Sequence, residues 1–123
     1  MVVAAGVNPP VIHESFTLLP CPRHPVSTLD LEGCDEHAIV ETDAQINARV
    51  KDIFGLLRLC SAGTSFVAGE QAWLRYRSAS CRAESSKFAG GTLESVHYGG
   101  CLVGRNKSHL AELAATKQIL SRP

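Results

Sequence analysis

Cysteine is the residue type of this chain best suited to chemistry, and it occurs at positions 21, 34, 60, 81 and 101. Cys21 and Cys34 each stand three residues before a histidine, His24 and His37. Such Cys-x-x-His pairs could hold zinc in a tetrahedral site, whereas disulfides are typical of small domains in oxidising compartments. Because the spacing between the two pairs is not that of a standard zinc finger, we expect disulfides and no metal.

Other reactive side chains are present without a catalytic motif around them. The sequence contains no glycine-rich phosphate loop, no nucleophile elbow and no His-Glu-x-x-His element. Glu70 beside Trp73 could serve as a general acid, but a buried ion pair is the simpler role. Cys60 could serve as a nucleophile, but a buried small residue is simpler, with pairing to a second chain as the alternative. We therefore expect no enzymatic activity and no cofactor.

Positive and negative charges balance, with 12 Lys and Arg against 12 Asp and Glu in 123 residues. A general affinity for nucleic acid or anionic lipid needs a basic surplus, so we expect neither partner. The balance hides a local acidic excess. The acids between His24 and Arg49, with no Lys or Arg among them, are Asp30, Glu32, Asp35, Glu36, Glu41 and Asp43. This segment is either a solvated helix face or a docking surface for a basic partner.

No apolar run approaches the roughly 20 residues that a membrane-spanning helix requires. The apolar start at residues 1–7 lacks basic residues and is too short for a complete signal peptide. If the protein is exported, we expect the signal to lie upstream of this chain or to have been replaced by this start.

Prolines divide the chain into an irregular N-terminal part and a helical domain. Proline fixes φ and removes a hydrogen-bond donor, and all but one of the six prolines fall in the first 26 residues. We expect residues 1–15 to be irregular and residues 16–123 to form a single domain. The N-terminal part should lie across the helices, because its apolar residues need cover: Val11, Ile12, Phe16, Leu18 and Leu19.

Two helical elements are expected before residue 61. Ser27 with Asp30 suits the start of a short turn that ends near Gly33. A longer helix over residues 36–60 is predicted by apolar residues that recur at helical spacing: Ile39, Ile46, Val50, Ile53 and Leu57.

A second helical region is expected after a stop at Ala62-Gly63. It should run from about 65 to 86, followed by a glycine-bounded loop over residues 90–100 and a third helix over residues 102–120. The 65–86 helix carries an unusual stripe that mixes apolar, charged and thiol side chains: Phe66, Glu70, Trp73, Arg77 and Cys81. Burying Glu70 or Arg77 alone would cost several kcal/mol, so we expect each to pair with the other, or with Asn47 or Asp43.

These motifs together resemble the family of the lysozyme inhibitor LprI, over roughly residues 16–113. The resemblance is carried by the run from Glu70 to Cys81, by Gly90-Gly91-Thr92, by Cys21, Cys34 and Cys101, and by Asp43, Ile46 and Asn47. Its structural signature here comprises Asp43, Asn47, Glu70, Trp73, Tyr76, Arg77, Gly90 and Gly91. The chain departs from the family pattern in having His109 where an arginine is expected, Glu70 where many members have glutamine, and Cys60 beyond the usual four cysteines.

The resemblance implies a fold and a set of disulfides. The expected fold is mainly α, a small disulfide-stapled antiparallel bundle of about three helices with an irregular proline-rich N-terminal segment. The implied pairs are Cys21 with Cys34 and Cys81 with Cys101, although the sequence permits other pairings. Each implied pair closes a short loop, which can stabilise a domain by roughly 3 kcal/mol.

The resemblance also implies a secreted or periplasmic cell-envelope protein that binds another protein. The most specific expectation is non-covalent blockage of a basic lysozyme by an acidic rim and the glycine-bounded loop. The candidate partner-binding residues are Asp30, Glu32, Asp35, Glu36, Glu41, Thr92, Glu94 and His97. The alternative is a structural or ligand-binding envelope domain whose groove around Trp73 and Arg77 receives a small anion or a peptide.

Overall fold

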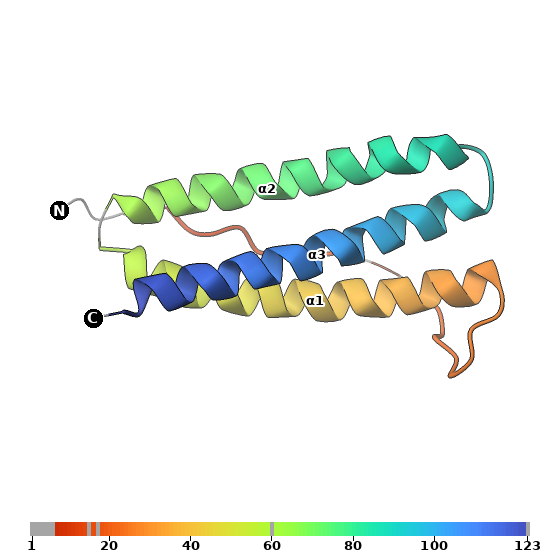
Figure 1. Cartoon of the computed structure of the whole chain (residues 1–123), viewed down its shortest axis with the longest axis horizontal. Helices are drawn as coiled ribbons and strands as arrows, with labels where there is room; N and C mark the ends of the chain where they lie inside the picture. Colours follow the sequence, from red (N-terminus) through yellow and green to blue (C-terminus); the bar gives the residue numbers. More distant parts are fainter. Residues whose placement is uncertain (1–6, 15, 17, 60, 123) are drawn as a thin grey trace.

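The computed structural model describes residues 7–14, 16, 18–59 and 61–122. Its long helices are α1 (Thr28–Leu57), α2 (Ala62–Ser85) and α3 (Leu93–Leu120), with the short 3-10 helix η1 (Ser86–Phe88) before α3. They lie along one axis, and each runs antiparallel to the long helix before it in the chain (Figure 1). Since the described part of the chain contains no β-strand, the expected mainly α bundle is confirmed. None of these helices is both long and apolar enough to cross a membrane.

α1 begins with the cap that the sequence predicts. The hydroxyl of Ser27 accepts from the backbone N–H of Asp30 at 3.0 Å, and the carboxylate of Asp30 accepts from the N–H groups of Val26 and Ser27. The expectation of a short turn that ends near Gly33 is wrong, because α1 continues through Gly33 to Leu57. A side chain at Gly33 would collide with the backbone oxygen of Pro20, so glycine here permits a close approach.

Two further glycine-based boundaries are also wrong for the same reason. Gly63 lies inside α2, where an added Cβ would stand 2.7 Å from the carbonyl oxygen of Leu57. Gly99 lies inside α3, where an added Cβ would stand 3.1 Å from the side chain of Asp35. The expected loop over residues 90–100 is therefore mostly the start of α3. Among the described residues, only Gly90, with φ of 79°, has the left-handed backbone of a tight turn.

The core consists of two apolar clusters along the bundle axis. Ile46, Val50, Ile53 and Leu113 form one cluster, and Ile39, Cys81 and Leu102 form the other. The apolar stripe predicted for the first helix is thus confirmed as its buried face. α3 packs mainly against α1 and less against α2, while α1 and α2 make the least contact with each other.

The N-terminal segment passes between α1 and α2 (Figure 1). As expected, it lies across the helices, with Ile12 packed against the first core cluster and Phe16 against the second. The expectation of cover fails for Val11, which is 75% exposed, and for Leu18, which is also exposed.

Two disulfides join the elements as the family resemblance implied. Cys21–Cys34 ties the N-terminal segment to the first turns of α1, and Cys81–Cys101 ties α2 to α3. The alternative zinc set is contradicted, because the sulfurs of Cys21 and Cys34 are bonded to each other. Cys60, which we expected to be buried or to pair with a second chain, lies outside the described residues.

Candidate functional site

Arg77 lies at the centre of a buried polar cluster where the three helices and the N-terminal segment meet. Its side chain is 2% exposed. Nη1 donates to Oδ1 of Asp43 in α1 and to Oδ1 of Asn106 in α3, both at 2.8 Å. Nη2 donates to Oε1 of Glu14 at 2.8 Å. Because a buried guanidinium is costly without partners, these bonds allow it to occupy the bundle interior.

Glu70 has a partner other than the expected one. Nε2 of His109 lies 2.8 Å from Oε2 of Glu70, and the His109 ring stacks on Trp73 with centroids 3.8 Å apart. The expected pairing of Arg77 with Asp43 is confirmed, whereas pairing of Glu70 with Arg77 is wrong. Glu70 and His109 are two of the three departures from the family pattern noted in the sequence, and these two side chains contact each other. Their burial suits a structural role.

The other signature residues lie near the surface. Asn47 binds the main chain of Ile12 in the N-terminal segment. Tyr76 is exposed, and its ring lies beneath the guanidinium of Arg105. Gly90 and Gly91 form the turn before α3, where the N–H of Gly91 donates to the carbonyl of Phe88.

The N-terminal ends of α1 and α3 lie at the bundle end away from the C-terminus (Figure 1). Acidic side chains from both helices line two hollows there. Glu32, Asp35 and Glu36 line a hollow of about 100 Å³ between these helices. Glu94 lines an adjoining hollow of about 410 Å³. Ser95 and Tyr98 line both hollows, so we call the four acids around Tyr98 the acidic rim.

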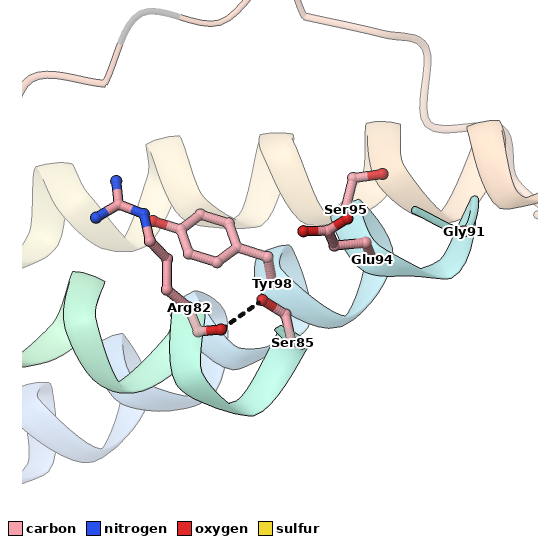
Figure 2. Close-up of a pocket in the computed structure, with 6 residues that line it drawn as sticks. All are labelled: Arg82, Ser85, Gly91, Glu94, Ser95 and Tyr98. Carbon is pink, nitrogen blue, oxygen red and sulfur yellow. Dashed lines mark hydrogen bonds between the residues drawn. The ribbon is translucent and has the colours of Figure 1, made fainter. Parts of the chain in front are cut away.

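Figure 2 shows how the larger hollow is built. Tyr98, Ser95 and Glu94 follow one another along α3, and Arg82 faces Tyr98 from α2. The hollows together are lined by the four rim carboxylates and the Arg82 guanidinium, so this part of the surface carries a negative excess. Such an excess attracts cationic groups over a distance set by the ionic strength.

Individual rim acids are held in different ways. The Leu19 N–H donates to Glu36 at 3.1 Å, and the Gly90 N–H donates to Glu94 at 3.1 Å. Asp35 packs against the bare backbone of Gly99, and burial there raises the pKa of its carboxyl above the ordinary value of 3.8. Asp35 therefore holds its charge at a cost to the folded state.

The remaining predicted partner-binding residues occupy different settings. Asp30 caps α1, and backbone N–H groups of Val26 and Ser27 lower the pKa of its carboxyl. Glu41 and Thr92 are exposed, and His97 stacks on Phe88 with ring centroids 3.7 Å apart. Asp43, at the end of the acidic run, is buried on Arg77 and is unavailable to a partner.

Sequence reasoning missed four residues of the larger hollow, Arg82, Ser85, Ser95 and Tyr98. A signal for the last two existed. Ser95, Tyr98 and Leu102 are spaced by three and four residues, as on one helix face, but the neighbouring glycine pairs favoured the interpretation as a loop.

The fold and the disulfides define a small three-helix domain typical of an oxidising compartment, with an acidic surface at one end. Residues 21–113 match the family described as lysozyme inhibitor LprI, and the chain belongs to this family. No curated protein and no solved structure matches the chain.

Proposed function

We propose that this chain is a secreted or cell-envelope inhibitor of a lysozyme, and that the acidic rim docks on the basic surface of that enzyme. Membership of the lysozyme inhibitor LprI family is the observation that carries the proposal. Inhibition is by obstruction and needs no catalytic residue in the inhibitor. The two disulfides support an extracytoplasmic setting, where the walls that lysozymes attack are found.

Two features of the acidic rim support its assignment as the contact surface. It presents carboxylates from α1 and α3, which pack against each other more extensively than any other pair of these helices, and the Cys81–Cys101 disulfide ties α3 to α2. It also surrounds Tyr98, an aromatic residue of the kind that is enriched in protein interfaces. A rigid surface loses little conformational entropy on binding, and opposite charge raises the association rate.

The test is inhibition of a basic lysozyme acting on a cell-wall suspension, with and without added salt. We expect inhibition at micromolar concentration, and a lower association rate at higher ionic strength because exposed charges are screened. The double variant Glu32→Gln/Asp35→Asn should weaken inhibition by roughly tenfold or more, as expected for lost charge-assisted contacts. The matched control is Glu112→Gln, an exposed acid further along α3, which should leave inhibition unchanged.

Two results distinguish the parts of the proposal. Failure to slow any lysozyme at micromolar concentration would leave the alternative of a structural or ligand-binding envelope domain. Inhibition that the double variant and the control reduce equally would place the contact surface elsewhere on the bundle.

A further inference from the structure

The N-terminal segment between α1 and α2 is held through its main chain. Oδ1 of Asn47 accepts from the N–H of Ile12 at 2.8 Å, and Nδ2 of Asn47 donates to the carbonyl of Ile12 at 3.0 Å. This pair of bonds reproduces the way in which one strand recognises another, and it is independent of the side chain at that position. Asn47 therefore binds an extended backbone as such.

Specificity comes from the side chains on either side of His13. In an extended segment, residues two apart face the same way, so Ile12 and Glu14 both face the helices while His13 is exposed. Ile12 packs against the first core cluster, and Glu14 reaches Nη2 of Arg77 at 2.8 Å. The groove is therefore specific for a peptide with an apolar residue at the first of three consecutive positions and an acidic residue at the third. It accepts any residue at the middle position.

The recognising groups are oriented independently of the segment. Asp43 and Asn106 hold Nη1 of Arg77 from α1 and α3, so Nη2 is fixed in direction by residues outside the segment. A preorganised guanidinium binds a carboxylate without first losing rotamer freedom. The walls of the groove lie within residues 21–113, whereas residues 7–14 lie outside this family match.

The segment itself is loosely packed. Hollows of about 580 Å³ and 230 Å³ lie between it and α1, and one of about 310 Å³ lies between it and α2. Glu14 retains 34% exposure although its partner Arg77 is buried. Val11 is 75% exposed and Ile12 is the residue of this segment that packs against the first core cluster, so release of the segment exposes little apolar surface beyond Ile12 and breaks its bonds to Asn47 and Arg77.

We propose that the groove between α1 and α2 is a binding site for an extended peptide of the form apolar-x-acidic from a partner protein, and that residues 7–14 occupy it as a displaceable internal ligand. This site is separate from the acidic rim and does not depend on lysozyme inhibition. An internal ligand lowers the apparent affinity for an external one by the fraction of time that the groove is open. Weakening the internal segment should therefore strengthen binding of the external peptide.

The test uses the full chain and a fluorescent, C-terminally amidated peptide with the sequence of residues 7–14. Binding of the peptide is measured by fluorescence anisotropy. We expect the Glu14→Gln chain to bind this peptide roughly tenfold or more tightly than the unaltered chain, because its own segment has lost a charge-assisted bond. A peptide with Gln in place of Glu at its last position should bind the same variant roughly tenfold more weakly. Adding Asn47→Asp, which removes the amide donor to the main chain, should abolish binding.

Several results would overturn the proposal. Absence of saturable binding to the Glu14→Gln chain up to about 1 mM peptide is one. Equal affinity for the two peptides, or binding that Asn47→Asp leaves intact, is another. A Glu14→Gln chain that fails to fold, judged by circular dichroism, would show that the segment is required for the fold and is not displaceable. Dimerisation of that variant without peptide would assign the groove to a second copy of this chain.

Discussion

Arg77 and Arg105 make similar contacts in two different environments. Each pairs with a glutamate, at 2.8 Å for Arg77 with Glu14 and 2.6 Å for Arg105 with Glu84. Each places its guanidinium carbon over an aromatic ring, at 5.6 Å for Arg77 and 5.7 Å for Arg105. They differ in burial, because the side chain of Arg77 is 2% exposed and that of Arg105 is 29% exposed.

This difference predicts unequal costs for the same substitution. Arg77→Met leaves the buried carboxylate of Asp43 without its cation, and we expect the free energy of unfolding to fall by about 3–5 kcal/mol. Arg105→Met removes an exposed pair and should cost less than about 1 kcal/mol. Urea unfolding of both variants measures the two losses. Equal losses would show that the cluster around Arg77 contributes no more than a surface ion pair.

Partner choice among these polar residues was only partly predictable from the sequence. Asp43 was a candidate for Arg77 because it is a polar residue of the first predicted helix. Asn106 and His109 were missed, although Leu102, Asn106, His109 and Leu113 are spaced by four, three and four residues and are all buried. This buried stripe was overlooked because Asn106 and His109 are polar, and helical periodicity is usually sought among apolar residues. Glu14 was unpredictable because no local pattern tells where an irregular segment meets a helix 63 residues away.

At the scale of the elements, glycines mark contact between segments more often than they mark helix ends. Gly33, Gly63 and Gly99 are buried inside helices, each against a residue from another turn or element. The helices themselves were predictable from apolar periodicity. The boundaries of the helices were not predictable from the sequence. Glycine is needed at these positions for close tertiary packing, which the local sequence does not reveal.

The contact role of Gly33 predicts opposite results for two Gly→Ala substitutions. At Gly104, an added Cβ meets nothing within 4 Å, so the helix propensity of alanine should raise the free energy of unfolding by about 0.5–1 kcal/mol. At Gly33, the added Cβ collides with the Pro20 backbone, and displacing that backbone should lower the free energy of unfolding by about 1–3 kcal/mol. Thermal and urea unfolding measure both changes. A stabilised Gly33→Ala chain would show that the N-terminal segment yields freely there.

At the scale of the whole molecule, the net charge is zero, but acidic and basic side chains are distributed unevenly over the surface. The basic partners of buried acids are used inside the bundle, as at Arg77, while the acidic rim has only Arg82 among the cations lining its two hollows. A concentration of like charge costs folding stability through self-repulsion and desolvation. Such a cost is typical of a surface that serves binding, and removing it should stabilise the free protein.

Asp35 and Asp30 test this distribution through the pH dependence of stability. The pKa of Asp35 is raised by burial, so the folded state binds more protons than the unfolded state between pH 3.8 and that raised pKa, and stability falls as pH rises through this window. Asp35→Asn removes this loss of stability because asparagine does not ionise. It should therefore raise the melting temperature at pH 7, by a margin that shrinks as pH falls toward 3.8.

Asp30→Asn should act in the opposite direction. The pKa of Asp30 is lowered by the N–H groups of Val26 and Ser27, so its carboxylate contributes stability above pH 3.8 that is lost as pH falls through the lowered pKa. The substitution should lower the melting temperature at pH 7 and lose its effect in acid. Melting curves of both variants from pH 2 to 8 measure the two trends.

If Asp35→Asn stabilises the chain at pH 7 and also weakens lysozyme inhibition, the acidic rim retains a charge that is unfavourable for folding because the partner neutralises it. If it stabilises the chain and leaves inhibition intact, the contact surface lies away from Asp35.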